Sequence, residues 1–392
     1  MTKVARPHGR RGIANGCQPI QAGTDATGGA LPFLGERRRP RHRRLSYRVG
    51  PYPLMAGASN WLDDLRTVSD PAPPTRAEEP RKDRSTVSGV PDVLVLGGGG
   101  LLGEAWMSGF LGGAQHACGV DFREANEFVG TSAGSIVAAH LANGIEPRVP
   151  QQSDALAQWD VTDRDIPMAR IDRAFREWVT ALYPITRRAT AASGTVGALA
   201  RAALLSGLPA GVRSMEELRN GYAATLGSRF DPRLRIVAVD RQTGRRVVFG
   251  ERPGAPGAEL AEAISASCAL PGYFAPVRIA GRQYVDGGVW SATNIDVASV
   301  RRGDRILCLT PTAVLTSSRW PALRAVGKAW ELATTLEVAS VRRRGATVTI
   351  VGPDARSARA LGENLMDTRR LESALAQGFR QGIASQRHTS AS

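Results

Sequence analysis

One serine of this sequence stands between two glycines in a pattern typical of nucleophiles. Gly130, Ser132 and Gly134 form G-x-S-x-G within EFVGTSAGSIVAAHLAN. The apolar residues before the pattern predict a short strand, and those after it predict a helix, so Ser132 would occupy the turn between them. Such a turn holds a hydroxyl clear of the sheet, where it can attack a carbonyl carbon. The alternative is a glycine-serine turn with a structural role only.

A nucleophilic serine needs a base, and the positions of the histidines exclude the usual partner. Three of the five histidines lie near the chain ends: His8, His42 and His388. His140 lies on the predicted helix after Ser132, about 12 Å away at a rise of roughly 1.5 Å per residue. His116 lies near the far end of another predicted helix. A Ser-His-Asp triad is therefore not expected, and the base must be a carboxylate.

The candidate carboxylate is Asp286, in the stretch YVDGG. It ends an apolar run typical of a strand, and Gly287 and Gly288 follow it, which allows close approach of the backbone. Partial shielding from water can raise the pKa of a carboxylate enough for it to accept a serine proton. Without Ser132, the same residues would be interpreted as a plain turn.

A third motif, VLVLGGGGLLG, offers backbone N–H groups. Gly98, Gly100 and Gly103 match G-x-G-x-x-G, the spacing that cradles a dinucleotide pyrophosphate. That function needs a second strand ending in an acidic residue about 20 residues further on. Asp121 stands at that distance, but no convincing strand precedes it, and the next predicted strand runs into GTSAG. A nucleotide-dependent oxidoreductase is therefore the weaker alternative.

Taken in order, GGGGLLG, GTSAG and VDGG resemble the motifs of the patatin-like phospholipase family. The stretch AISASCALPGYFAPVRIAGRQYVDGGVWSATNID is similar to the segment that leads to the family's catalytic aspartate. NLMD, at 364–367, is similar to a C-terminal segment of bacterial members. The resemblance covers roughly 92–370. It implies an α/β fold in which a mostly parallel central sheet is flanked by helices in three layers.

The resemblance also implies a lipid acyl hydrolase of phospholipase A or lysophospholipase type that uses a Ser-Asp dyad. On this chain Ser132 would be the nucleophile and Asp286 the base, and the N–H groups of Gly98, Gly99 and Gly100 would form the oxyanion hole. A glycine loop at a helix N-terminus suits this role, because bare N–H donors and the helix dipole stabilise an anion. The expected partner is a lipid or another acyl ester, and no metal, nucleotide or other cofactor is expected.

Some positions depart from the family pattern. The family often has Asp before the glycines and Arg or Lys before the last one, where this chain has Gly97 and Leu102. Neither change removes a backbone donor, but the second removes one means of anchoring the loop. The proline that follows the family's Asn is also absent, since Asn294 precedes Ile295 and Asp296. These departures motivate an alternative, a catalytically weak relative that binds lipid or a partner protein.

The remaining patterns predict the elements that position these residues. We expect strands at 92–96, 127–130, 234–240, 245–250, 305–310 and 346–351, with two more around Gly281. Further helices are expected at 103–117, 259–269, 321–342 and 367–382. This alternation predicts a mostly parallel sheet with helices on both faces. A helical insertion is expected at about 150–230. Such insertions often cap a site, and ordinary helix packing is the alternative.

The basic residues are concentrated near the N-terminus. The chain of 392 residues has a net charge of +15, and 11 of its 51 Lys and Arg lie in 1–54, against Asp25 and Glu36. Residues 1–88 are rich in Pro, Arg and Gly, which predicts a disordered extension and linker before a folded domain at 89–385. Contact of the basic segment with nucleic acid or anionic lipid is an alternative, although no specific nucleic acid is expected. A further alternative is that translation starts at Met55 and that the basic segment is not part of the native protein.

The cysteines and the apolar segments indicate the cellular compartment in which the protein is expected. Four scattered cysteines without a C-x-x-C pair predict neither a metal site nor a disulfide framework. No segment has the pattern of a secretory signal or of a membrane-spanning helix. We therefore expect a cytoplasmic protein, with peripheral membrane contact as an open alternative. The sequence predicts neither the lipid class nor the oligomeric state.

Overall fold

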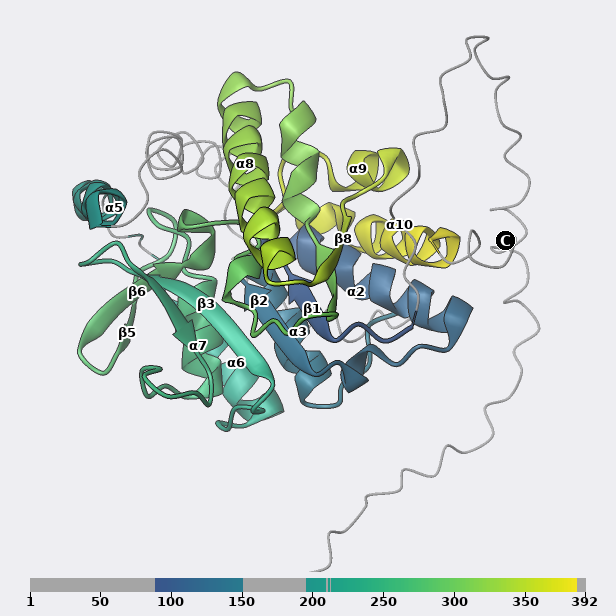
Figure 1. Cartoon of the computed structure of the whole chain (residues 1–392). Coiled ribbons are helices and arrows are strands. Elements are labelled where there is room, and N and C mark those ends of the chain that lie inside the picture. Colours follow the sequence, from purple (N-terminus) through teal and green to yellow (C-terminus); the bar gives the residue numbers. More distant parts are fainter. Residues whose placement is uncertain (1–88, 151–194, 209–210, 212, 386–392) are drawn as a thin grey trace, which may run out of the picture. The chain divides into compact units, whose positions relative to one another are not determined.

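The computed structural model describes residues 89–150, 195–208, 211 and 213–385 (Figure 1). The extension predicted for 1–88 and the first part of the predicted insertion, 151–194, lie outside these residues. The fold and the candidate site that follow are therefore those of the described part of the chain. In that part, no helix combines the length and the apolar character needed to cross a membrane.

An eight-stranded mixed sheet forms the centre of this fold. Its strands are β1 (Val93–Leu96), β2 (Glu127–Thr131), β3 (Leu234–Asp240), β4 (Arg246–Phe249), β5 (Val277–Ile279), β6 (Arg282–Asp286), β7 (Arg305–Leu309) and β8 (Thr347–Val351). Their order is β5-β6-β3-β2-β1-β7-β8, and β4 pairs with β3 beside this path. The pairs among β3, β2, β1, β7 and β8 are parallel, and those made by β4, β5 and β6 are antiparallel. The predicted mostly parallel sheet is confirmed.

The alternation of side chains along the strands divides the core into two layers. On β1, Leu94 and Leu96 belong to one hydrophobic cluster, whereas Val93 and Val95 belong to another. Because successive side chains of a strand point to opposite faces, each cluster lies on its own face of the sheet. The first cluster continues into α2 (Gly100–Cys118), α3 (Ala133–Ala142) and α7 (Leu260–Ser267), and the second into the C-terminal half of α8 (Pro321–Arg343). Helices therefore cover both faces, as predicted.

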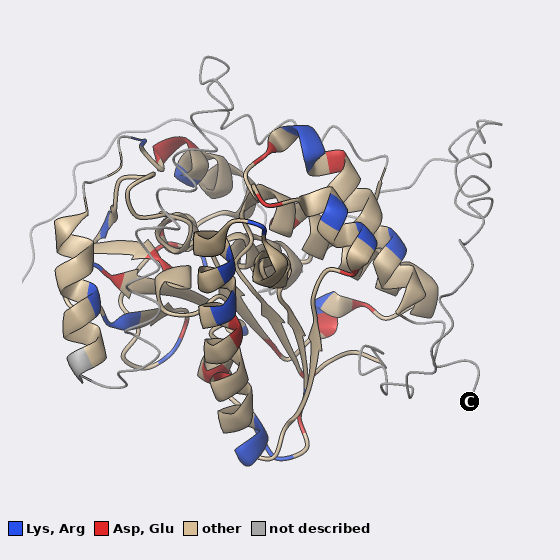
Figure 2. Cartoon of the chain, turned by 90° about the horizontal axis from the view of Figure 1, so that it is seen from above, with Lys and Arg blue, Asp and Glu red and all other residues tan. Residues whose placement is uncertain are grey.

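The charged side chains follow this layering. Figure 2 shows Lys, Arg, Asp and Glu concentrated on the helices and connections, while the strands at the centre are mostly uncharged. β1 and β8 contain no charged residue at all. For β1, all of whose residues are buried, the reason is that a charge without a partner is costly there.

The helix after the glycine loop, α2, packs against α10 (Leu371–Ala384) with almost no space between the backbones. A Cβ built on Gly109 would lie 2.2 Å from the carbonyl oxygen of Leu375, and one on Gly378 would lie 2.3 Å from that of Trp106. Both distances are far below van der Waals contact, so each helix needs glycine where the other crosses it. The small residues of α2 therefore allow the two helices to pack closely.

The remaining helices complete the described fold and include two departures from prediction. They are α5 (Thr195–Gly207) and α6 (Glu216–Leu226), both inside the predicted insertion, and α9 (Ala355–Leu361). Helix α2 begins at Gly100, earlier than the predicted residue 103, because the first turn includes the glycine loop itself. Helix α10 begins at Leu371, later than the predicted 367, because the Asp367 carboxylate accepts from the N–H of Arg369 and forms a separate turn first.

Candidate active site

Ser132 lies at the turn between β2 and α3, as the sequence predicts. Its φ of 52° and ψ of −125° are a conformation that residues other than glycine rarely adopt. The neighbouring glycines provide space: a Cβ on Gly134 would lie 1.9 Å from the carbonyl oxygen of Leu96, and one on Gly130 would lie 2.5 Å from Cα of Ser135. The strain therefore falls on the serine, and the glycines let β1 and α3 approach each other.

Two other serines hold the backbone of this turn. The hydroxyl of Ser267, at the end of α7, accepts from the N–H of Ser132 at 2.8 Å and donates to the carbonyl of Val237 at 2.6 Å. Ser135 Oγ donates to the carbonyl of Ser132 at 2.6 Å. The turn is thus fixed on both sides, and the N–H of Ser132 is engaged. Nothing in the sequence singled out Ser267, because a serine in a helix of small residues carries no signal of its own.

The side chain of Ser132 points at Asp286, the last residue of β6. Ser132 Oγ donates to Oδ2 of Asp286 at 2.7 Å, and the N–H of Gly288 donates to Oδ1 at 2.7 Å. Asp286 is 1% exposed and Ser132 is 9% exposed. The structure therefore brings into contact the two side chains that the sequence singled out for a nucleophile and a base.

Burial raises the pKa of Asp286 to about 7, although the hydrogen bonds from Ser132 and Gly288 act in the opposite direction. A carboxylate inside a protein loses the hydration that stabilises its charged form. At neutral pH the group can therefore accept a proton and release it again, which suits a base that later serves as an acid.

The two histidines in the described part of the chain pack elsewhere. The ring of His140 lies beside Tyr222 of α6, with centroids 6.0 Å apart, and the ring of His116 lies 5.9 Å from that of Phe379 of α10. This agrees with the exclusion of a Ser-His-Asp triad. The same part of the chain contains no group of three or more His, Cys, Asp or Glu side chains that could hold a metal ion.

The glycine loop runs past Ser132 into α2. A Cβ built on Gly98 would lie 3.5 Å from Cβ of Ser132. The N–H of Gly98 donates to the carbonyl of Ala292 at 2.8 Å, so this donor is already engaged. The N–H groups of Gly99 and Gly100 have no hydrogen-bond partner among the described residues. Of the three donors predicted for an oxyanion hole, these two are available.

A buried asparagine links the segments that carry Ser132 and Asp286. Nδ2 of Asn294 donates to Oγ1 of Thr131 at 3.1 Å and to the carbonyl oxygen of Gly287 at 3.4 Å. Thr131 directly precedes Ser132, and Gly287 directly follows Asp286. One side chain thus spans both segments, although the sequence indicated Asn294 only as a position of the family pattern.

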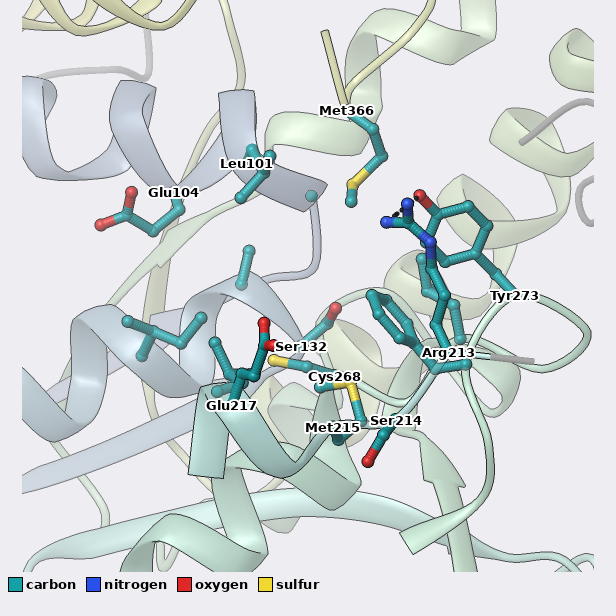
Figure 3. Close-up of a pocket in the computed structure, with 16 residues that line it drawn as sticks. Leu101, Glu104, Ser132, Arg213, Ser214, Met215, Glu217, Cys268, Tyr273 and Met366 are labelled. Carbon is teal, nitrogen blue, oxygen red and sulfur yellow. Dashed lines mark hydrogen bonds between the residues drawn. The ribbon is translucent and has the colours of Figure 1, made fainter. Parts of the chain in front are cut away.

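Two pockets meet at Ser132. The first, which we call the α6 pocket, is shown in Figure 3, and its apolar lining includes Leu101, Ala133, Ile136, Met215, Leu218, Leu270, Phe274 and Met366. The second, which we call the Asp286 pocket, is lined by Asp286, the glycine loop, Ala292, Thr312, Leu315, Trp330 and Leu365. Gly100, Ser132, Leu270 and Met366 border both pockets. Ser132 therefore lies where two largely apolar hollows join.

A comparison with protein families supports the interpretation of these motifs. The model of the patatin-like phospholipase family matches residues 94–299, more than half of the chain, and this range includes the glycine loop, Ser132 and Asp286. The chain belongs to the patatin-like phospholipase family. It is therefore a member of a family of lipid acyl hydrolases, whose general activity is the hydrolysis of esters.

Solved structures similar to this patatin-like chain include those of VipD and ExoU. VipD from Legionella pneumophila is 13% identical with a TM-score of 0.35, and the match covers 76% of this chain and 67% of VipD. The type III effector protein ExoU is 17% identical with a TM-score of 0.32, and the match covers 77% of this chain and 54% of ExoU. This chain thus spans about half the length of ExoU. The family assignment rests on the family model.

The glycine loop has Leu102 where patatin-like proteins often have a basic residue, and the loop is anchored through its backbone instead. Leu102 is fully buried, and its N–H donates to the carbonyl of Leu365 at 3.0 Å. Gly100 has a φ of +59°, and a Cβ on it would lie 2.7 Å from the same carbonyl. The NLMD segment therefore holds the glycine loop through the backbone, and the absence of a side chain at Gly100 permits this approach.

Proposed function

We propose that this protein is a serine hydrolase of lipid acyl esters in which Ser132 is the nucleophile and Asp286 the general base. The observation that carries the proposal is the 2.7 Å hydrogen bond from Ser132 Oγ to Asp286 Oδ2 at a strained, buried turn. A hydroxyl in contact with a base that is itself held in place is the arrangement that activates a serine for attack.

The reaction divides into two steps through an acyl-enzyme. Ser132 Oγ forms a bond to the ester carbonyl carbon while its proton passes to Asp286. The N–H groups of Gly99 and Gly100, with the positive ends of α2 and α3, stabilise the oxyanion that results. The bond to the alcohol oxygen then breaks, and this oxygen takes the proton from Asp286. Water attacks the acyl carbon while Asp286 takes one of its protons. The bond from that carbon to Ser132 Oγ then breaks, Oγ takes the proton back from Asp286, and the carboxylic acid leaves.

In its finer form, the proposal is phospholipase A or lysophospholipase activity by a cytoplasmic protein that contacts membranes peripherally. The family and the apolar lining of both pockets support a substrate with long hydrocarbon groups. Apolar walls favour such groups because burying hydrocarbon contributes about 0.8 kcal/mol per methylene.

Hydrolysis by the purified full chain tests the proposal. The substrates are p-nitrophenyl octanoate and phosphatidylcholine in mixed micelles, with release of fatty acid as the readout. We expect Ser132→Ala to lower kcat by about a thousandfold or more. Ser206→Ala, at an exposed serine of α5, should match the wild type. Equal rates for wild type and Ser132→Ala would overturn the hydrolase and favour a patatin-like protein that only binds lipid.

A further inference from the structure

Ser132 lies at the border of the two pockets, but its proton acceptor lies in only one of them. The Asp286 carboxylate lines the Asp286 pocket together with Gly288 and Trp330. It is absent from the described lining of the α6 pocket, which continues past Ser132 toward α3 and α6. The two hollows are therefore chemically different even though both have apolar walls.

This asymmetry matters because of what happens to the proton. When the tetrahedral intermediate breaks down, the proton held by Asp286 must reach the oxygen of the departing alcohol, so that oxygen has to lie within hydrogen-bond distance of the carboxylate. The tetrahedral carbon has four substituents, and the alcohol oxygen points toward Asp286. The oxyanion points toward the Gly99 and Gly100 N–H groups, and the third substituent is Ser132 Oγ. The fourth substituent of the carbon, the acyl chain, is left with the direction away from Asp286.

We infer that the α6 pocket holds the acyl chain and that the Asp286 pocket holds the alcohol part of the ester. The inference rests on the proposed function, because it uses Ser132 as nucleophile and Asp286 as the group that returns the proton. It makes Leu218 of α6 a residue that determines acyl-chain length. It makes Thr312 and Leu315, which follow β7, residues that determine the size of the alcohol.

The α6 pocket has the character that a hydrocarbon chain requires. Its one buried carboxylate, Glu104, is paired with Arg148, so its charge is compensated outside the cavity. Figure 3 shows the Glu104 carboxylate turned away from Ser132, and it shows Arg213 beside Tyr273, to whose hydroxyl it donates at 3.1 Å. The lining also includes Ser214 and the exposed carboxylate of Glu217. Most of the remaining surface consists of aliphatic, aromatic and sulfur-containing side chains.

The Asp286 pocket has the character that the alcohol part requires. Its described lining contains no Lys or Arg, and Asp286 is its one ionisable side chain. Trp330 Nε1 donates to the carbonyl of Gly288 at 2.9 Å, which fixes the indole as a wall beside the carboxylate. The part of the alcohol next to the ester bond is therefore expected to be compact and uncharged. Once the alcohol has left, the same space admits the water that hydrolyses the acyl-enzyme.

Two series of esters test this division in the full-length protein. One series keeps p-nitrophenol and varies the acyl group from butyrate through octanoate to palmitate. The other keeps the octanoyl group and varies the alcohol from methanol to hexanol. Leu218→Trp should lower the ratio of kcat/KM for palmitate to that for butyrate at least about tenfold. Leu218→Ala should raise the same ratio, and neither change should alter the ranking of the alcohols.

Variants of the other pocket should give the converse result. Thr312→Leu fills the Asp286 pocket and should lower kcat/KM for the hexyl ester relative to the methyl ester by about tenfold. The ranking of the acyl groups should stay as in the wild type. Leu315→Ala enlarges the same pocket and should shift the alcohol ratio in the opposite direction. Leu226→Ala, at a leucine of α6 that lines neither pocket, is the matched control for Leu218→Ala and should change neither ratio.

The outcomes separate this inference from the function on which it rests. If Leu218 variants change the alcohol ranking and Thr312 variants change the acyl ranking, the assignment of the pockets is reversed and the inference fails. If every variant alters both rankings equally, the division itself fails. If the wild type hydrolyses no ester in either series, or no faster than Ser132→Ala, the proposed function fails instead. Circular dichroism and Tm establish that each variant is folded.

Discussion

At the scale of single residues, the proposed mechanism makes the activity of Ser132 depend on the protonation state of Asp286. The carboxylate must be ionised to accept the serine proton, and burial places its pKa at about 7. We therefore predict that kcat/KM rises with pH through about 7 and then levels off. Rates with a water-soluble ester between about pH 5 and pH 9 measure this profile. A midpoint near the ordinary value of an aspartate would contradict the role of burial.

The same carboxylate should lower the stability of the protein at alkaline pH. The folded-state pKa of about 7 lies above the unfolded value of about 3.9, so the contribution of Asp286 to stability is present below about pH 4 and lost as the pH rises through 7. We predict that Asp286→Asn raises the free energy of unfolding at pH 8, by on the order of 2–4 kcal/mol, and raises it less at pH 5. Activity should fall sharply.

Thermal unfolding of both proteins at the two pH values checks this prediction. The variant keeps an oxygen that can accept from the N–H of Gly288, so the turn itself is preserved. A variant that is less stable than the wild type at pH 8 would show that Asp286 stabilises the fold in its ionised form, contrary to this account.

Residue types and spacing were sufficient to single out Ser132 and Asp286, because few side chains can serve as nucleophile and base once the histidines are excluded. Spacing could not indicate which N–H groups of the glycine loop are available. That depends on Ala292, whose carbonyl engages Gly98 from a distant part of the chain. The support that Ser267 gives to Ser132 escaped prediction for the same reason.

At the scale of elements, the fit between α2 and α10 depends on glycine. A Cβ at Gly109 would lie 2.2 Å from a backbone oxygen of α10, whereas one at Gly221 of α6 would meet nothing within 4 Å. We predict opposite effects of the same substitution. Gly109→Ala should lower the free energy of unfolding by about 1–3 kcal/mol or more. Gly221→Ala should raise it by about 0.5–1 kcal/mol, because alanine favours the helix.

Chemical denaturation of the two variants measures both effects. The comparison controls for helix propensity, because each substitution adds one methyl group inside a helix. A Gly109→Ala variant as stable as the wild type would mean that α10 does not lie where the structure places it. Activity is expected to fall with Gly109→Ala as well, since α2 begins at the glycine loop beside Ser132.

Most elements could be predicted because their apolar runs have the period of a buried strand or a helix. Strands β3 and β4 lie at the predicted ranges, and β5 and β6 lie on either side of Gly281 as predicted. The order of the strands could not be predicted, because it depends on pairings such as that of β1 with β7, which are distant in sequence. The early start of α2 also escaped prediction, since four glycines in a row do not indicate a helix.

At the scale of the whole molecule, the proposed catalytic residues and both pockets lie within the range 89–385. The family match also begins inside this range, at residue 94. We predict that a chain without residues 1–88 keeps kcat/KM within about twofold of the full-length value on a water-soluble ester. A loss of more than about tenfold in a folded truncated protein would show that the domain extends further toward the N-terminus.

The division of the chain into an extension and a domain remains a prediction from composition. Net charge and residue content indicate where a core can form, but they say nothing about what a basic segment contacts. The family, in contrast, followed from three short motifs in a fixed order. Those motifs could be recognised because, in the proposed mechanism, each supplies a different part of one reaction: a nucleophile, a base and a set of N–H donors.

The covalent labelling of Ser132 tests the central claim most directly. A fluorophosphonate probe reacts with an activated serine, and mass spectrometry of peptides from the full-length protein identifies the modified residue. We predict one adduct, on Ser132, that is lost in Ser132→Ala and forms much more slowly in Asp286→Asn. Labelling at another serine, or labelling of Ser132 at an unchanged rate without the Asp286 carboxylate, would contradict the proposed dyad.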